Sequence, residues 1–361
     1  MTPAGAVPGN GPHIEPGEAS EPGAGVASYR RSGVDLDAAG AAVRRIREVA
    51  RSASRPEVIA AVGGFAGLVD LGDGRLLAAA TDGVGTKLEV ARLAGAVGTV
   101  GIDLVAMSAN DVVCTGAEPL FFLDYLAVDR VVPDEVAAIV SGVAEGCRRA
   151  GCALLGGETA EHPGTMEQGQ FDLAGFCVGI VHRSDLIGPQ RVGPEDTLIG
   201  FRSSGLHANG FSLVRRVLLT GGRSLRDPIA ELGGRTLAEE LLTPTEIYVR
   251  GVLALCRAGL ACSAAHITGG GFFENVPRAL PDGLGAVIDT SAWTPQPIYG
   301  VVARAGGLEP AELYGVLNMG IGMVVVVPNG AVGRALQETR SAGADPVVIG
   351  QVVEGGGVVL Q

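Results

Sequence analysis

Lysine is almost missing from this 361-residue chain: of its 27 basic residues, all but Lys87 are arginine. So strong a bias toward arginine indicates that Lys87 has a task that a guanidinium cannot perform. An ammonium is a compact point charge with rotatable donors, suited to a phosphoryl oxygen, whereas a guanidinium is a rigid planar fork. The scarcity of lysine therefore directs attention to the segment that Lys87 closes, residues 80–87.

Basic charge is scarce overall, with a formal net charge of −12 and a pI near 4.9. A nucleic-acid surface needs clustered Lys or Arg, so this balance argues against one. No apolar run reaches the ~18 residues that a membrane span needs. Residues 1–28 contain no Lys or Arg and are crowded with Gly, Pro and Ala, so they lack a signal peptide's basic start. We expect them to form a disordered tail.

Cysteine is present, but its spacing offers no C-x-x-C pair for zinc or redox work. The six cysteines are scattered through apolar segments, at Cys114, Cys147, Cys152, Cys177, Cys256 and Cys262. We expect buried free thiols in a reducing cytoplasm.

Apolar periodicity predicts alternating helices and strands in the first half of the chain. The predicted helices cover 34–49, 86–93, 102–113 and 133–151, and the predicted strands cover 120–128, 152–155 and 173–181. A polar, proline-bearing stretch over 182–196 is the best candidate for a domain junction.

The pattern restarts beyond that junction. We predict strands over 197–201 and 323–327, a helix over 210–219 that ends at Gly221-Gly222, and a strand that enters a glycine turn over 266–271. Thr243-Pro-Thr-Glu246 predicts a capping box with proline at the first helical position. Together these patterns predict an α/β fold of the α+β type, with a tail over 1–28, domains over 29–183 and 184–361, and helices on one face of each sheet.

The segment that ends at Lys87 combines groups that can bind a phosphate. Asp82 could hold a metal, and Gly83 and Gly85 let backbone N–H groups approach an anion closely. The segment does not fit the pattern G-x-x-x-x-G-K-[ST], so a P-loop is not expected. The alternative is a single surface lysine beside a turn.

A second acidic segment covers residues 101–111. Asp103 and Asn110 are seven residues apart, which places them on one helix face about 10 Å apart, and Asp111 lies beside them. Oxygen ligands of this kind suit Mg²⁺ that is held jointly with nucleotide phosphates. The alternative is an ordinary amphipathic helix with a polar face.

Three more glycine segments carry acid, amide or imidazole groups. Glu158, in the segment 156–161, follows an apolar strand and is expected at the strand's carboxyl end, where α/β proteins place their sites. The turns at His207 and His266 each precede a helix, whose N-terminus can receive a phosphate. One histidine is more often structural, but two beside glycine turns at helix starts indicate a site. The residues thus predict a Mg²⁺-assisted enzyme that acts on nucleotide and sugar phosphates.

These segments, in this order, resemble the aminoimidazole ribonucleotide synthetase family, also called phosphoribosylformylglycinamidine cyclo-ligases. The resemblance runs from about residue 28 to the C-terminus. Besides the segments above, it is carried by residues 28–37, 55–58, 63–65, 116–125 and 174–179.

The resemblance implies the fifth step of purine biosynthesis, in which ATP and formylglycinamidine ribonucleotide give aminoimidazole ribonucleotide, ADP and phosphate. ATP would phosphorylate the formyl amide oxygen, and the amidine nitrogen would then close the imidazole ring. The resemblance also implies ATP and Mg²⁺ as cofactors, a cytoplasmic homodimer whose N-terminal domains meet in a barrel-like interface, and a C-terminal α/β domain that completes each cleft. Neither a nucleic acid nor a membrane is an expected partner.

By motif match, the resemblance implies roles for individual residues. The catalytic candidates are Lys87, Asp111, His207 and His266. The candidate metal ligands are Asp82, Asp103, Asp111 and Glu158. Nucleotide or phosphate contacts are expected from Gly63, Gly64, Asp82, Gly83, Gly85, Thr86, Gly156, Gly157, Glu158 and Thr159. Substrate contacts are expected from Ser204, Asn209, Gly269, Gly270 and Gly271.

Two other functions stay open at this point. One is another ATP-dependent kinase or synthetase of the same superfamily, and the other is a non-catalytic or respecialised nucleotide-binding homologue. The presence of Asp82, Lys87, Asp111 and His207 disfavours the second.

Overall fold

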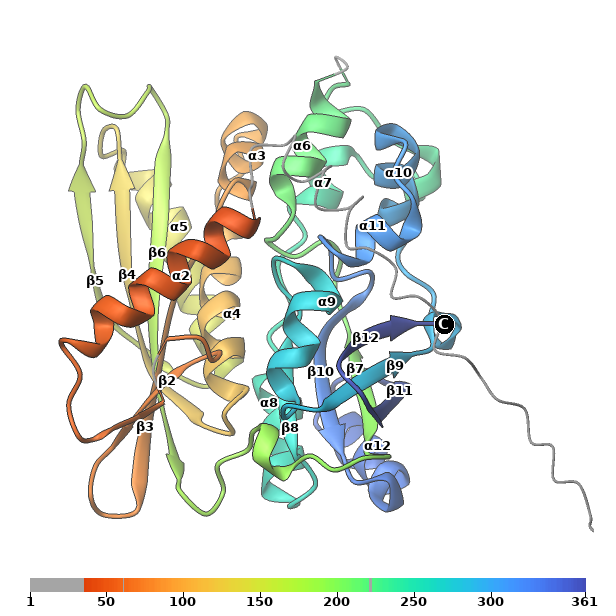
Figure 1. Ribbon diagram of the computed structural model, residues 1–361. Helices are drawn as coiled ribbons and strands as arrows, with labels where there is room; N and C mark the ends of the chain where they lie inside the picture. The colour runs from red at the N-terminus through yellow and green to blue at the C-terminus, as the bar shows by residue number, and fades with distance from the viewer. Residues whose placement is uncertain (1–35, 61, 221–222) are drawn as a thin grey trace, which may run out of the picture.

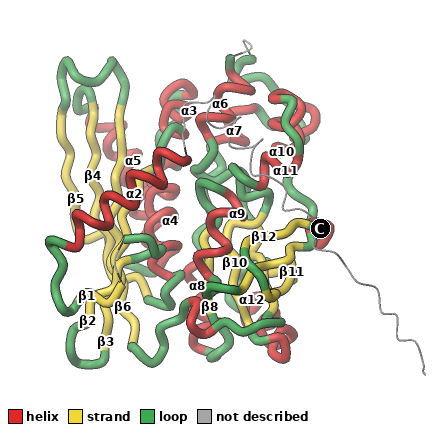
Figure 2. The backbone as a smooth tube through the Cα atoms, in the orientation of Figure 1, coloured by secondary structure: helices red, strands yellow, loops and turns green. Residues whose placement is uncertain are grey.

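The structure, a computed structural model, describes residues 36–60, 62–220 and 223–361 (Figure 1). The predicted tail over 1–28 and the predicted helix end at Gly221-Gly222 lie outside these residues. Each half of the described chain is organised by a six-stranded sheet (Figures 1 and 2). This confirms the predicted α/β fold with two domains, while the bounds 29–183 and 184–361 stay a prediction.

The N-terminal sheet has the strand order β1-β2-β3-β6-β4-β5. Its strands are β1 (Val58–Ala60), β2 (Gly67–Asp70), β3 (Arg75–Gly83), β4 (Glu118–Val128), β5 (Ala153–Glu161) and β6 (Phe171–His182). β4 and β5 are parallel and the other neighbours antiparallel, so the sheet is mixed. It curves into half a barrel, and α4 and α5 cover the face that is turned toward the C-terminal half (Figure 1).

The N-terminal helices are α2 (Leu36–Arg51), α3 (Lys87–Ala94), α4 (Val100–Val113) and α5 (Pro133–Ala150). α4 is the central one: all its residues except Asp111 are buried. Glycine at position 101 lets α4 pack closely on α5, since a Cβ there would lie only 2.4 Å from the backbone oxygen of Ile139. α5 begins at Pro133 and ends at Gly151, whose φ of 76° caps it, as predicted.

The C-terminal sheet has the strand order β12-β9-β11-β7-β10-β8, antiparallel except for the pair β12 and β9. Its strands are β7 (Thr197–Arg202), β8 (Ser263–His266), β9 (Leu284–Ile288), β10 (Ile321–Val327), β11 (Pro346–Glu354) and β12 (Gly357–Leu360). The helices are α6 (Phe211–Leu219), α7 (Leu237–Leu241), α8 (Val249–Arg257), α9 (Gly271–Asn275), α10 (Pro297–Gly306), α11 (Pro310–Tyr314) and α12 (Val332–Ser341). Every residue of β10 is buried, which explains its uninterrupted apolar sequence.

Two local predictions are wrong. The strand predicted over 152–155 does not end before the glycines of 156–161, because β5 continues to Glu161 in parallel pairing with β4, and the ladder outweighs the weak strand preference of glycine. Thr243-Pro-Thr-Glu246 caps no helix, since α8 begins only at Val249. The capping box of this region is instead formed by Thr236 and Glu239 on α7.

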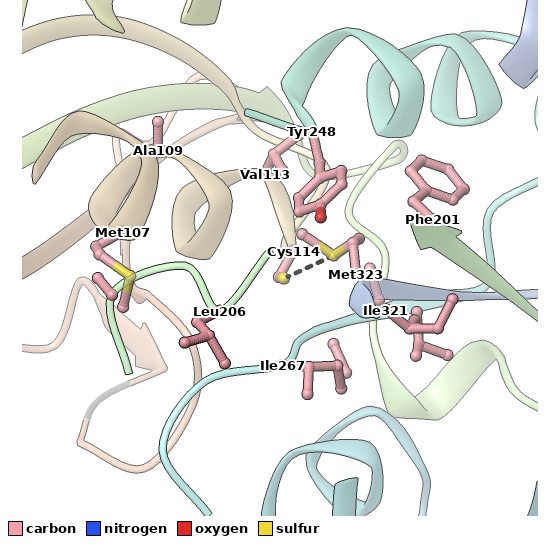
Figure 3. Close-up of a cluster of buried hydrophobic side chains, with 14 of the residues drawn as sticks. Met107, Ala109, Val113, Cys114, Phe201, Leu206, Tyr248, Ile267, Ile321 and Met323 are labelled. Atoms are coloured by element: carbon pink, nitrogen blue, oxygen red, sulfur yellow. Dashed lines mark hydrogen bonds between the residues drawn. The ribbon is translucent and has the colours of Figure 1, made fainter. Parts of the chain in front are cut away.

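The two halves share one hydrophobic core, which continues across their junction (Figure 3). At the C-terminal end of α4, the Cys114 sulfur lies 3.8 Å from the Met323 sulfur of β10. Phe201, Tyr248 and Ile321 from the C-terminal half surround this contact. The buried junction therefore fixes α4 against the C-terminal sheet, and α4 is the element that presents Asp111 to it.

Candidate active site

Asp111 and His266 form the polar contact that joins α4 to the end of β8. The Nδ1 atom of His266 lies 2.9 Å from Oδ1 of Asp111, and its Nε2 atom lies 3.4 Å from the amide nitrogen of Asn110. The imidazole is 1% exposed and the carboxylate 19%. A histidine that carries its proton on Nδ1 satisfies both contacts, because it donates to Asp111 and accepts from Asn110. The pair thus has a fixed ring and a carboxylate that a ligand can still reach.

Asp82 adds a second carboxylate at the end of β3. It is partly buried, and its Oδ1 accepts a hydrogen bond of 2.8 Å from the backbone N–H of Gly83. Burial raises the pKa of Asp82 to about 6, and the negative charge of Asp111 acts in the same direction. Two mutually repelling carboxylates at a domain junction favour a cation between them or beside them.

The four predicted metal ligands do not come together in one chain. Glu158 is exposed on β5, where it pairs with Tyr125 and lies on the open outer face of the sheet, three strands or roughly 14 Å from Gly83. Asp82 points to the other face, toward α4. Among the described residues, no group of three His, Cys, Asp or Glu side chains could hold a metal ion. Mg²⁺ nevertheless fits Asp82 and Asp111, because it is commonly bound by one or two carboxylates together with substrate phosphates.

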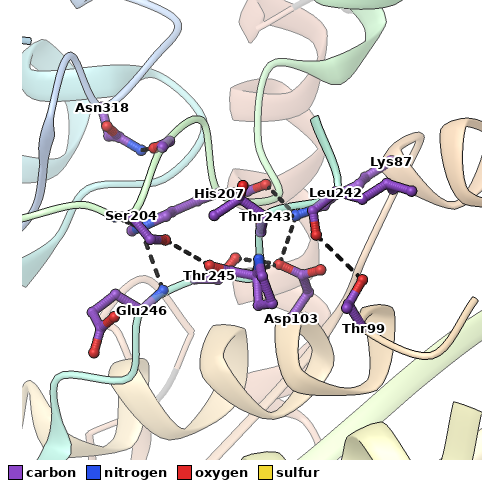
Figure 4. A network of polar contacts seen from close by, with 12 residues as sticks. Lys87, Thr99, Asp103, Ser204, His207, Leu242, Thr243, Thr245, Glu246 and Asn318 are labelled. Atoms are coloured by element: carbon purple, nitrogen blue, oxygen red, sulfur yellow. Dashed lines mark hydrogen bonds and ion pairs between the residues drawn. The ribbon is translucent and has the colours of Figure 1, made fainter. Parts of the chain in front are cut away.

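Lys87 is completely buried, and protein acceptors surround its ammonium (Figure 4). Its ammonium donates to Oδ1 of Asp103 at 2.9 Å and to the backbone oxygens of His207 at 2.9 Å and Thr243 at 2.8 Å. These bonds use all three donors of the ammonium. Burial lowers the pKa of Lys87 and raises that of Asp103, and the ion pair opposes both shifts. In the described structure Lys87 therefore ties the two halves together, and a catalytic role for it stays a prediction.

Asp103 belongs to the same tie, and its Oδ2 is buried without a hydrogen-bond partner within the described residues. Its Oδ1 also accepts hydrogen bonds from the backbone N–H of Thr245 at 2.8 Å and from the Thr245 hydroxyl at 2.6 Å. Seven residues along α4, Asn110 donates to Glu246 O and accepts from Tyr248 N, both at 2.9 Å. The predicted shared face is confirmed, and it holds the extended segment 243–248. A metal-binding role for Asp103 stays a prediction.

His207 lies beside this tie with a strained backbone, at φ 64°, and is 2% exposed. Its Nε2 accepts from the backbone N–H groups of Ser204 and Glu246, at 3.3 and 3.4 Å. Burial, with the nearby His266 and Lys87, holds the pKa of His207 well below its usual range. The proton of the neutral ring is therefore on Nδ1, and within the described residues this atom has no partner. A buried N–H of this kind is a candidate donor to a ligand.

The two predicted glycine turns do come together. Asn209 lies against Gly269, since its amide nitrogen is 3.9 Å from where a Cβ of Gly269 would be. Gly271 has a φ of 56°, and a Cβ there would lie 2.0 Å from the backbone oxygen of Tyr314, so only glycine fits. Gly270 precedes it at the start of α9.

Other candidates lie around this centre or away from it. Gly83, Gly85 and Thr86 form the loop from β3 to α3, and the Thr86 hydroxyl lies 3.2 Å from that of Ser212. Ser204 donates to Pro244 O and lines a different cavity of about 540 Å³, together with Arg149, Arg202, Arg250 and Glu246. Asp82, Asp111 and His266 do not line that cavity. Gly156, Gly157 and Thr159 lie with Glu158 on the exposed strand β5.

Several residues that shape the site had no signal in a sequence pattern. Gly322 on β10 leaves room for two rings, because its Cβ would lie 2.2 Å from the Tyr248 hydroxyl and 2.4 Å from Cε1 of His207. Thr245 and Arg278 contribute contacts that depend on the packing of the two halves. The segment around Thr245 had only one sequence signal, the capping pattern at 243–246, and that pattern caps no helix.

Comparison with known proteins defines the class first. Sequence models of the AIR synthase related proteins match this chain, the N-terminal domain over residues 63–181 and the C-terminal domain over residues 193–361. The chain therefore has both domains of the AIR synthase related proteins, and the candidate site lies between them.

The relatives then narrow the class. A phosphoribosylformylglycinamidine cyclo-ligase from Shouchella clausii is 49% identical over 338 residues, which cover 92% of this chain and 98% of the relative. One from Myxococcus xanthus is 50% identical over 334 residues, covering 91% and 97%. The chain belongs to the phosphoribosylformylglycinamidine cyclo-ligase family.

Solved structures agree on the fold. A crystal structure of a protein from Thermus thermophilus has a TM-score of 0.61 at 26% identity and covers 85% of this chain and 91% of that one. PurL of T. maritima complexed with ADP has a TM-score of 0.56 at 18% identity, covering 84% of this chain and 45% of that one.

Proposed function

We propose that this protein closes the imidazole ring of aminoimidazole ribonucleotide, using ATP and formylglycinamidine ribonucleotide and releasing ADP and phosphate. The observation that carries the proposal is about 50% identity to cyclo-ligases over nearly the whole of both chains. The site adds carboxylates, imidazoles and glycine turns from both halves, which is the chemistry that such a reaction needs.

The reaction balances in two steps. The formyl amide oxygen takes the γ-phosphoryl group of ATP, and ADP leaves. The amidine nitrogen then forms a bond to the activated carbon, loses a proton, and the carbon–oxygen bond breaks to release phosphate. The protein's part is to position the reactants and to neutralise charge, as in other phosphoryl transfers.

Each residue group has a task that follows from its geometry. Asp82 and Asp111 would hold Mg²⁺, which neutralises nucleotide phosphates when it is bound. His266 has both ring nitrogens engaged, by Asp111 and Asn110, and is 1% exposed, so its task would be to orient the Asp111 carboxylate beside the Gly269 turn. The Nδ1–H of His207 can donate to an oxygen of the substrate or of phosphate. ATP as the nucleotide is supported by a structural neighbour that is complexed with ADP.

The open face of the N-terminal sheet supports a homodimer. Tyr125 and Phe176 are 42% and 40% exposed there although both are large and apolar, and Leu123, paired with Phe176, extends the patch. An exposed apolar face on half a barrel is typical of an interface with a second copy. Glu158 and Thr159 would then lie at or near this interface.

No helix of the described residues is long and apolar enough to cross a membrane. We keep the cytoplasm as the proposed location, since the substrates are phosphorylated metabolites and the six cysteines are free.

The direct test mixes the purified protein with ATP, Mg²⁺ and formylglycinamidine ribonucleotide and follows both ADP and the arylamine-like product. We expect ADP only when all three are present, in equal amount to the product. Binding of ATP without ADP formation would favour a non-catalytic homologue. ADP formation with thiamine monophosphate instead, the substrate in the name of a structural neighbour, would favour a kinase.

A further inference from the structure

Arg278 connects the two halves at the edge of the candidate site. It lies in the 3-10 turn Val276–Ala279 that follows α9. Its Nη2 donates to the backbone oxygen of Gly64 at 2.9 Å, and its Cζ lies 3.7 Å from the centre of the Phe65 ring. Its Nη1 donates to Oδ1 of Asn275 at 3.0 Å. The face of the guanidinium thus stacks on Phe65, and one edge donates to Gly64, both in the N-terminal half. A second edge donates to Asn275 in the C-terminal half.

Asn275 links Arg278 to the glycine turn of the C-terminal half, because it is hydrogen-bonded to both. Its side chain is buried, and its Nδ2 donates to the backbone oxygens of Gly269 at 3.0 Å and Gly271 at 2.8 Å. The bond from Arg278 to Oδ1, with a longer one of 3.4 Å from the Thr268 hydroxyl, sets which way the amide points, because a carbonyl oxygen accepts and the NH₂ group donates. The conformation of the turn therefore depends on the guanidinium.

Among the described residues, the loop at Gly63 and Gly64 is also contacted by Arg47 of α2, whose Nη2 would lie 2.1 Å from a Cβ at Gly63. Both glycines are exposed, and neither has a side chain that could pack. On the far side, Nε of Arg47 donates to the backbone oxygen of Val62 at 3.0 Å. Arg278 supplies the contact from the other domain.

We propose that Arg278 is a positioning residue that couples the loop 63–65 to the turn 269–271, so that the nucleotide-facing and the substrate-facing backbone are ordered together. What each loop binds rests on the proposed function, but the coupling itself does not. Lysine cannot replace this contact, since an ammonium is unable to stack flat on Phe65 while donating from two separate edges.

The test compares Arg278→Met and Arg278→Lys with a matched control, Arg257→Met. Arg257 also forms an ion pair between the two halves, with Glu118 at 3.0 Å, but both side chains are more than half exposed and lie away from the site. Hydrogen–deuterium exchange of the substrate-free protein should rise by about 10-fold in the segments 62–67 and 268–275 of Arg278→Met, because a charged hydrogen bond is lost at each. Arg257→Met should exchange as the wild type does.

Two further measurements distinguish coupling of the loop 63–65 to the turn 269–271 from a general loss of order in the loops. Trp293, the only tryptophan, stacks on Phe272 at 6.1 Å, so its emission reports on the turn. We expect Arg278→Met to shift this emission and to lower kcat/KM by about 10²-fold, with KM raised for both substrates. Arg278→Lys should fall between Arg278→Met and the wild type.

The coupling is refuted if only one of the two segments exchanges faster, or if Arg278→Met matches Arg257→Met in exchange and in kcat/KM. If Arg278→Met does not fold, Arg278→Lys carries the same comparison. If the wild type fails to turn over formylglycinamidine ribonucleotide, the proposed function fails, while the exchange result still decides the coupling.

Discussion

Two acidic clusters lie where the halves of this protein meet, and they differ in how many of their hydrogen bonds are already made. In the first, Lys87 and Asp103 are both completely buried, and the ammonium has three protein acceptors. In the second, Asp82 and Asp111 remain partly accessible, and burial raises the pKa of Asp82 to about 6. In the first cluster the three donors of the ammonium are all used, and Oδ2 of Asp103 is buried without a partner within the described residues. The second cluster keeps carboxylate oxygens accessible to a ligand.

Residues of both clusters lie on the same helix, α4, but on different faces of it. Asp103 and Asn110 share a face of α4 and bind the segment 243–248, while Asp111, one residue further and about 100° around the axis, meets His266. Acidic residues of one short motif therefore have different tasks. The first holds the halves together, and the second is offered to a ligand.

Removing the buried ammonium should have the largest effect on stability. Lys87→Met leaves two backbone oxygens without their donor and the buried Asp103 carboxylate without its counter-charge, with only Thr245 still donating to it. We therefore expect a loss of about 3–5 kcal/mol in the free energy of unfolding. Urea unfolding followed by circular dichroism measures it. A loss below about 1 kcal/mol, the level of an exposed pair, would mean that the ion pair does not hold the halves together.

Asp111→Asn should show the opposite profile. The substitution keeps the shape of the side chain but removes the charge that orients His266 and that would hold Mg²⁺, so we expect kcat to fall by ~10²–10³-fold. The free energy of unfolding should change by less than about 1 kcal/mol. Steady-state kinetics with saturating ATP checks the first number, and a kcat equal to that of the wild type would remove Asp111 from the site.

Asp82 should make stability depend on pH in the absence of Mg²⁺. Because its folded pKa of about 6 lies above the ordinary value of 3.8, the folded state binds this proton more tightly than the unfolded state. Its contribution is fully present below pH ~4 and is lost as pH rises through 6, at a cost of up to about 3 kcal/mol relative to Asp82→Asn. Urea midpoints of both proteins from pH 4 to 8 should diverge. Parallel curves would show that Asp82 is not desolvated.

The smallest effect should come from an ion pair that water reaches. Arg257 and Glu118 also link the two halves, but at 66% and 56% exposure. We expect Arg257→Met to cost less than about 1 kcal/mol, and even less in roughly 0.5 M salt. A cost similar to that of Lys87→Met would show that burial is not what separates the two ion pairs.

Much of the fold follows from the sequence because it depends on local patterns. α5 begins at the proline and ends at the glycine that predict it, and β10 covers the apolar run. The error at residues 156–161 arises because pairing with β4, a partner about 30 residues away, carries β5 through the glycines. Local propensity contains no information about that partner.

In the site, too, local patterns predict some features, whereas others depend on residues far away in the sequence. The lack of other lysines draws attention to Lys87, and the three donors of its ammonium match the three acceptors around it. What the sequence could not show is that two of the acceptors are backbone oxygens at His207 and Thr243, more than 100 residues further on. A backbone oxygen can be supplied by any residue, so no pattern of side chains predicts it.

The central claim is that Lys87 stabilises the junction and Asp111 serves the reaction, and the most direct test measures unfolding and turnover on both variants side by side. We expect Lys87→Met to lower the free energy of unfolding by about 3–5 kcal/mol, and Asp111→Asn to leave it nearly unchanged while abolishing most turnover. The account would be contradicted if Lys87→Met were as stable as the wild type but inactive, because Lys87 would then serve the reaction and not the junction.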